Sequence, residues 1–84
     1  MLKCFFHPTA EKELARLPRK IQEQIKNKIK QLSQLNHPLQ HPKVKKLKGT
    51  KLEVFRLRSG DYRIIFILIE PNIIKITHIR HRGK

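Results

Sequence analysis

The stretch LEVFRLRSGDYRIIFILIE, residues 52–70, decides the fold. From Leu52 to Arg58 apolar and polar side chains alternate, which is the pattern of a half-buried strand. Ser59-Gly60-Asp61 is a tight turn signal, so the segment from Tyr62 to Glu70 is predicted to return as an antiparallel strand. Because this second segment is apolar on both faces, we expect it to be the central strand of a sheet, covered on both sides.

The segments around this hairpin supply helices and further strands. Residues 2–6 form a compact apolar run typical of a first strand, and Pro8 suits the first position of a helix. After Pro18, an apolar stripe predicts a second helix through Ile21, Ile25, Ile29, Leu32 and Leu35. Strands are also expected within Lys43–Gly49 and at Ile73–Arg80. We therefore predict an α+β fold in which an N-terminal strand and a helical hairpin pack on a curved antiparallel sheet of three to four further strands.

The composition is strongly basic. The 84 residues allow a single domain, residues 1–84, and carry 20 Lys and Arg against six Asp and Glu, for a formal net charge of +14. Most of the excess lies in the second half of the chain. A charge of this size disfavours compaction and predicts a polyanionic partner: nucleic acid first, an acidic protein second and a membrane surface third.

Cysteine usage and hydropathy indicate the compartment. Cys4 is the one cysteine, which excludes an internal disulfide and suits a reducing environment. No signal peptide is visible, and the most apolar run, Ile64–Ile69, is too short to cross a bilayer. We therefore expect a soluble, cytoplasmic protein with no membrane partner.

Strand alternation predicts a cluster of arginines. Arg56 and Arg58 project from the face opposite Phe55 and Leu57, and Arg63 begins the next strand across the turn, so Arg58 and Arg63 are expected to lie close together. One interpretation is a solvated strand edge whose charges prevent aggregation. The other is a phosphate site, because guanidinium groups match phosphate oxygens and would stabilise the charge that develops at phosphorus during strand cleavage.

Further basic residues extend this surface. The lysines around Gly49 would hold an RNA backbone by charge, with salt-dependent and sequence-independent affinity. The candidate RNA- or phosphate-binding residues are Lys45, Lys46, Lys48, Lys51, Arg56 and Arg80. Tyr62 is either a base-stacking platform or a residue that packs in the core near the turn.

A proton acceptor is less evident than the cations. Because a protonated guanidinium cannot take a proton, His81, beside Arg82, is the simplest candidate acid or base, and a lysine among neighbouring cations is the alternative. His78 is expected to share a face with Ile74 and Ile76 and to be structural. The histidines lack metal-ligand spacing and the glycines do not form a phosphate loop, so we predict neither a metal nor a cofactor.

The run Lys46-Leu47-Lys48-Gly49, followed by FRLRSGDYRIIF at residues 55–66, resembles the signature of the RelE/ParE toxin superfamily. The opening FHPTAEKEL at residues 6–14 and the ending HRGK at residues 81–84 are also similar to that family, so the likeness covers nearly the whole chain. The resemblance implies a RelE-like fold, which is microbial-ribonuclease-like. It also implies the toxin of a type II toxin–antitoxin system, inhibited by a cognate antitoxin with an acidic toxin-binding segment.

For the RelE-like branch, the resemblance implies a metal-independent endoribonuclease, an mRNA interferase that inhibits translation. Such enzymes cut mRNA in the ribosomal A site by attack of the 2′-hydroxyl on the adjacent phosphate. Arg63 and Arg82 match the catalytic arginines of that branch, and Arg58 matches a position that stabilises the phosphate. Many members continue past the position of Lys84 to a tyrosine that stacks on a base or aids catalysis, and this sequence shows no such residue.

Two other functions remain open at this point. A ParE-like toxin would inhibit DNA gyrase and cut nothing, and a non-catalytic RNA-binding module would only hold RNA. The fold is shared among these possibilities and cannot decide between them. The combination of Arg58, Arg63 and Arg82 favours the nuclease, because the gyrase-directed branch usually lacks the complete set.

Overall fold

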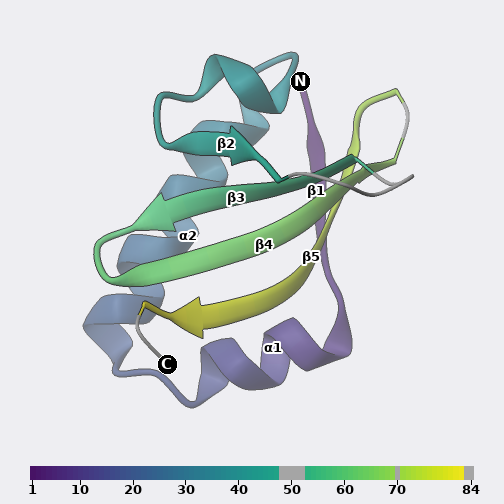
Figure 1. Ribbon diagram of the computed structural model, residues 1–84. Helices are drawn as coiled ribbons and strands as arrows, with labels where there is room; N and C mark the ends of the chain where they lie inside the picture. Colours follow the sequence, from purple (N-terminus) through teal and green to yellow (C-terminus); the bar gives the residue numbers. More distant parts are fainter. Residues whose placement is uncertain (48–52, 70, 83–84) are drawn as a thin grey trace.

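The chain folds into one sheet with helices on a single face (Figure 1). In this computed structural model residues 1–47, 53–69 and 71–82 are described. The elements in chain order are β1 (Lys3–Phe6), α1 (Pro8–Ala15), α2 (Arg19–Ser33), the 3-10 helix η1 (Pro38–Gln40), β2 (Val44–Lys46), β3 (Glu53–Ser59), β4 (Tyr62–Ile69) and β5 (Ile73–His81). Neither α1 nor α2 is long and apolar enough to span a membrane.

The sheet is mixed, with strand order β1-β5-β4-β3-β2. β1 runs parallel to β5, and the other three pairs of neighbours are antiparallel. Gly60 has a φ of 58°, a left-handed conformation that costs glycine little because it lacks a Cβ, and it makes the β3–β4 turn. The α+β class, the hairpin and the central position of β4 are therefore confirmed.

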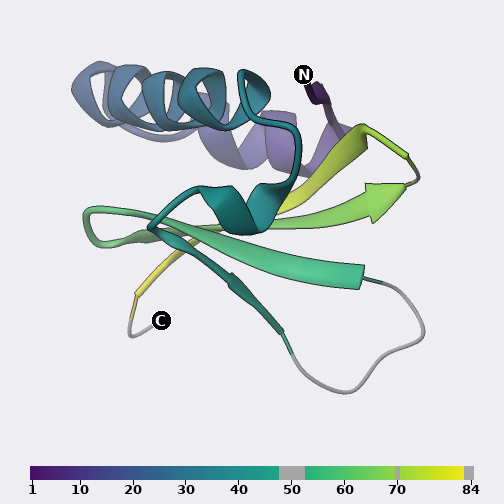
Figure 2. The same ribbon diagram turned by 90° about the horizontal axis from the view of Figure 1, so that it is seen from above.

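A proline marks the start of both helices, Pro8 as the first residue of α1 and Pro18 as the residue before α2, and each helix buries one stripe against the sheet. Pro8 lies in the first turn of α1, where its missing N–H costs no helical hydrogen bond, and the Nδ1 atom of His7 accepts a hydrogen bond from Thr9 N at 3.1 Å. α2 starts after Pro18, and its predicted stripe places Ile25, Ile29 and Leu32 in the core. Figure 2 shows the two helices together on the same side of the sheet.

The core lies between these helices and the inner face of β3, β4 and β5. Phe55 and Phe66, which are cross-strand partners, stack with ring centroids 5.4 Å apart and are almost fully buried. The other buried apolar residues of these strands are Leu57, Ile64, Ile74, Ile76 and Ile79. Alternation along each strand therefore directs the intervening residues to the opposite face, which we call the open face.

The prediction that β4 is covered on both sides is wrong. Ile64 is fully buried, but Ile65 and Ile67 are only partly buried and Ile69 is 43% exposed. The cause is that both α1 and α2 pack on the inner face, so no described helix covers the open face (Figure 2). An unbroken apolar run is typical of a doubly covered strand, but here half of it faces outward.

β5 contains an irregularity that changes which residues face inward. Ile65 pairs with His78 but the next residue, Phe66, pairs with Ile76, so Thr77 is an extra residue on β5, as in a β-bulge. The Thr77 hydroxyl donates to the carbonyl of Ile65 at 3.2 Å. The expectation that His78 shares a face with Ile74 and Ile76 is therefore wrong, because the extra residue shifts the alternation and Ile79 takes the buried position.

Candidate functional site

Three arginines from three adjacent strands form one cross-strand row on the open face. Arg58 of β3 pairs with Arg63 of β4, and Arg63 pairs with Arg80 of β5. Directly opposite residues in antiparallel strands have Cβ atoms only about 4.5–5.5 Å apart. We call Arg58, Arg63 and Arg80 the arginine row. The turn signal predicted the first pair, whereas the third member becomes evident only from the register of β5.

A polar pocket adjoins this row at the β2–β3 side of the sheet. Its volume is about 180 Å³, and the residues that line it are Pro42, Lys43, Lys45, Arg56 and Arg58. Lys45 and Arg56 are cross-strand partners, so they project from one row of the sheet, and Arg58 links the pocket to the arginine row. Neither Arg63 nor Arg82 lines the pocket. Lys43 and Lys45 both belong to the basic segment around Gly49 that the sequence indicates.

The arginines of this surface have no carboxylate partner among the described residues. The two ion pairs found among the described residues join Lys46 to Glu53 and His78 to Glu13, so neither involves an arginine. The buried Nε atoms of Arg56 and Arg63 have no hydrogen-bond partner in the described part of the chain. A buried donor without a partner costs about 1–3 kcal/mol, and like charges across strands repel. Both costs would be relieved by an anion whose oxygens accept from these groups.

The C-terminal residues return to the same end of the sheet. The backbone N–H of Arg82 donates to the carbonyl oxygen of Asp61 at 2.6 Å, which brings Arg82 beside the β3–β4 turn that separates Arg58 from Arg63. Arg82 is exposed. The structure thus brings the backbone of Arg82 to the end of the sheet where the arginine row lies, although Arg80 and not Arg82 is the cross-strand partner of Arg63.

The aromatic pair Tyr62 and His81 lies on the other face. The two residues are cross-strand partners, and their rings meet edge to face with centroids 5.0 Å apart. Tyr62 packs against the core, which agrees with the structural interpretation of this residue rather than with a base-stacking role. Because β4 and β5 alternate regularly from Tyr62 to Ile64 and from Ile79 to His81, His81 projects from the inner face, away from the arginine row.

His78 is the imidazole that lies next to the arginine row. Its Nδ1 atom is 3.4 Å from Nη2 of Arg80 and 3.6 Å from Oε1 of Glu13. The same carboxylate oxygen of Glu13 accepts a hydrogen bond from the backbone N–H of Ile79 at 2.8 Å. Sequence reasoning missed this cluster, because Glu13 and His78 are brought together by the packing of α1 against β5 and by the extra residue Thr77.

The candidate lysines are distributed differently from the expectation. Lys45 lies on the open face in the pocket, whereas Lys46 pairs with Phe55 and contacts Glu53 through its Nζ atom at 3.5 Å. Lys48 and Lys51 lie outside the described residues. Among residues 1–47, 53–69 and 71–82, no cluster of three His, Cys, Asp or Glu side chains could hold a metal ion.

Two groups near the helices have perturbed pKa values. Burial raises the pKa of the Cys4 thiol. His41 has its pKa lowered by burial, with the positive charges of Lys28 and Lys43 acting in the same direction. The Nδ1 atom of His41 accepts a hydrogen bond from Lys43 N at 3.0 Å, which requires that this ring nitrogen carry no proton. His41 therefore supports the start of β2 beside the basic pocket in its neutral form.

Comparison with known proteins identifies a family. The family model described as "ParE toxin of type II toxin-antitoxin system, parDE" matches residues 4–84. The comparison with curated proteins finds no match.

Three solved structures, all of toxin–antitoxin complexes, are similar over nearly the whole chain. The archaeal RelE–RelB complex from Pyrococcus horikoshii is 30% identical with a TM-score of 0.81, covering 99% of this chain and 97% of that one. The RelBE2 complex from Mycobacterium tuberculosis is 25% identical with a TM-score of 0.80, covering 96% and 98%. The RelB–RelE complex from Methanococcus jannaschii is 27% identical with a TM-score of 0.75, covering 92% and 88%.

Proposed function

The chain belongs to the ParE toxin family and is the toxin of a type II toxin–antitoxin system, and on this premise we propose that it is a metal-independent endoribonuclease that cleaves mRNA in the ribosomal A site. The observation that carries the proposal is the arginine row, three guanidinium-bearing residues side by side on the open face. No described strand residue on that face is an Asp or a Glu. In this proposal the row binds the scissile phosphate.

The chemistry assigned to the row is stabilisation of charge. The 2′-oxygen of a ribose attacks the adjacent phosphorus while the bond from phosphorus to the 5′-oxygen breaks, which leaves a 2′,3′-cyclic phosphate and a 5′-hydroxyl end. Negative charge increases on the phosphoryl oxygens in the transition state, where guanidinium donors held by neighbouring strands would bind most strongly. Arg58 and Arg63 are the row members that the family likeness also marks, and Arg82 approaches from the C-terminal end.

Proton transfer requires a group other than an arginine. The 2′-hydroxyl must lose a proton and the departing 5′-oxygen must gain one, and a protonated guanidinium has no site to accept a proton. We assign the acceptor role to His78, because its imidazole lies at Arg80 on the side of the arginine row, whereas His81 projects from the inner face. Glu13, whose carboxylate is near Nδ1 of His78, would stabilise the imidazolium that results.

We propose that an acidic antitoxin segment inhibits the toxin by covering the open face. A net charge of +14 and a sheet face with arginines, lysines and partly exposed isoleucines complement a segment that combines carboxylates with apolar residues. The three similar structures are complexes with antitoxins, which supports a partner of this class.

The test is to express the chain briefly in growing cells and to map the 5′ ends of cellular mRNA. Cuts in phase with codons of translated messages are expected, and Arg63→Ala and Arg82→Ala should abolish them and restore growth while the variants still bind the antitoxin. The name of the matching family model favours a second candidate, a ParE-like toxin that inhibits DNA gyrase. DNA damage with intact messages, or full toxicity of both variants, would replace the nuclease proposal by that alternative.

A further inference from the structure

A second cross-strand row crosses the open face away from the arginine row. Val54 of β3 pairs with Ile67 of β4, Ile67 pairs with Lys75 of β5, and Lys75 pairs with Phe5 of β1. Ile67 is four residues from Arg63 along β4, and at about 3.3 Å per residue the two rows are roughly 13 Å apart. The second row therefore ends at the β1 edge with an aromatic ring next to a lysine.

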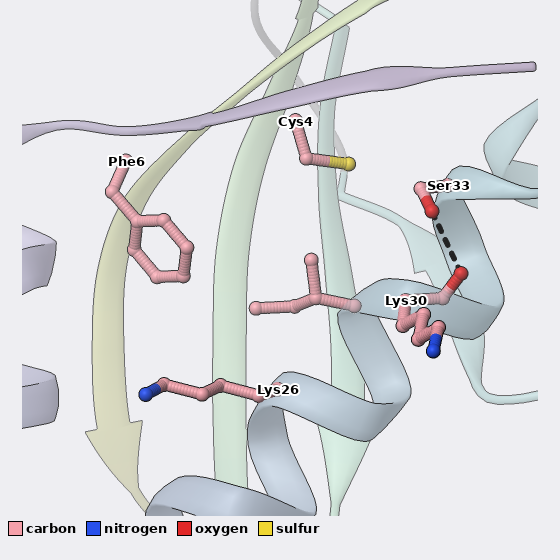
Figure 3. Close-up of a pocket in the computed structure, with 6 residues that line it drawn as sticks. Cys4, Phe6, Lys26, Lys30 and Ser33 are labelled. Atoms are coloured by element: carbon pink, nitrogen blue, oxygen red, sulfur yellow. Dashed lines mark hydrogen bonds between the residues drawn. The ribbon is translucent and has the colours of Figure 1, made fainter.

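Phe5 is an exposed aromatic residue on this face. Its neighbours in the chain, Cys4 and Phe6, both point from β1 toward α2, as Figure 3 shows, so alternation directs Phe5 to the open face. Phe5 is 56% exposed, whereas Phe55 and Phe66 are in the core and Phe6 and Tyr62 pack against it. Its ring therefore does little for the fold.

The surroundings of Phe5 are cationic. Lys75 is its cross-strand partner, and Lys3 lies two residues before it on the same face of β1. An exposed ring beside cations is how single-stranded nucleic acid is held without regard to sequence, because every base has a face that can stack and every nucleotide has a phosphate. A single ring at a strand edge offers a base-sized platform rather than the broad apolar pocket that a protein side-chain cluster needs.

We propose that Phe5 and Lys75 form a second RNA subsite, in which the ring stacks on a base of the strand whose phosphate lies at the arginine row and Lys75 binds a backbone phosphate. This inference rests on the proposed function, since it takes RNA to be the ligand of the open face. It adds a binding determinant on β1 and β5 that is remote from the cleavage chemistry. The subsite would thus contribute to RNA affinity and leave the rate of the chemical step unchanged.

The test measures binding and cleavage separately. Binding is followed by the fluorescence of a short 2′-O-methyl RNA that contains 2-aminopurine, with Phe5→Ala, Phe5→Trp, Lys75→Gln and the matched control Leu39→Ala. Leu39 is 52% exposed on η1, so the control removes a similarly exposed apolar side chain away from the open face. Thermal unfolding checks that each variant is folded.

Loss of one stacked base predicts that Phe5→Ala binds about 5-fold to 150-fold more weakly, with less quenching of the 2-aminopurine, while Phe5→Trp and Leu39→Ala bind like the parent chain. The slope of log K against log salt should stay constant for Phe5→Ala and fall by about 0.7 for Lys75→Gln, because only the lysine releases a counter-ion. Equal RNA affinity of Phe5→Ala and Leu39→Ala would overturn the subsite.

The cleavage measurement distinguishes this inference from the proposed function. On ribosomes programmed with mRNA, Phe5→Ala should raise the toxin concentration needed for half-maximal cleavage and keep the maximal single-turnover rate. If cleavage depends on Arg63 but Phe5→Ala equals the control in both assays, the subsite is wrong and the nuclease stands. If no mRNA is cut but Phe5→Ala still weakens RNA binding selectively, the nuclease is wrong and the subsite stands. Weakened antitoxin binding by Phe5→Ala with unchanged RNA affinity would reassign the ring to the protein partner.

Discussion

Replacing Arg63 by alanine should abolish activity without lowering the stability of the fold. Arg63 is the middle member of the arginine row, with Arg58 and Arg80 as its two cross-strand partners, and its Nε atom is buried without a hydrogen-bond partner among the described residues. A residue in this situation is unfavourable for the free protein and favourable only when an anion is bound. We therefore expect Arg63→Ala to lose cleavage and to gain, or at least keep, folding stability.

The size of both effects can be estimated. Loss of one donor to a developing oxyanion typically lowers the rate by about 10²–10³, equivalent to about 2.7–4 kcal/mol. Two like charges separated by roughly the 5.5 Å that separates opposite Cβ atoms repel by about 0.7 kcal/mol in a water-like dielectric, for each of the two neighbours, and salt reduces this by about half. Removing the buried Nε donor that has no partner stabilises the folded chain further, while the lost packing of the aliphatic stem of Arg63 destabilises it by about as much. The free energy of unfolding should thus rise by about 0–1 kcal/mol.

Single-turnover cleavage on programmed ribosomes and urea unfolding measure the two quantities. Arg63→Lys is the matched control: it keeps the charge but loses the forked donor, so it should lose most of the activity without the gain in stability. The reasoning would be refuted if Arg63→Ala lowered the free energy of unfolding by more than about 1 kcal/mol and left cleavage intact, because Arg63 would then be a structural residue.

Three further predictions follow from contacts around the site. Because the pKa of His41 is lowered in the folded state, its contribution to stability is present above the ordinary value near 6.5 and lost as the pH falls below it, so His41→Gln should flatten the decline of unfolding free energy with acidification in urea titrations. Glu13→Ala should destabilise the chain by about 1–3 kcal/mol in thermal or urea unfolding, since it leaves the Ile79 N–H without its acceptor, and Glu13→Gln should recover most of that loss. His78→Gln should lower the maximal cleavage rate by about 10²–10⁴, whereas His81→Gln should retain that rate; the opposite result would return the proton acceptor to His81.

Local sequence signals were sufficient for the β3–β4 hairpin. The Ser59-Gly60-Asp61 turn fixes the register between its strands, so the proximity of Arg58 and Arg63 could be read from short-range spacing alone. The stripe of α2 likewise predicted its buried face. The coverage of β4 was not predictable in this way, because an apolar run does not say whether the helices of a chain divide between the two faces or share one.

Which residues belong to the candidate site depends on the pairing of β5 with β4. Arg80 joins the row, and His81 leaves it, because of how β5 pairs with β4 after residue 77. The local sequence does not predict that irregularity, since Ile76, Thr77 and His78 all suit a regular strand. The contact of Glu13 with His78 depends in addition on how α1 packs against β5, a tertiary feature that no spacing rule provides.

One extra residue in β5, Thr77, reverses the alternation of the residues that follow it. If Thr77 instead paired regularly with Ile65, Ile79 would lie opposite Arg63 on the open face and Arg80 would turn beneath the helices. For any relative that lacks this extra residue in the final strand, an alignment without a gap would match Arg80 with a residue that faces the interior. Arginines equivalent to Arg80 should therefore be identified by superposing the structures.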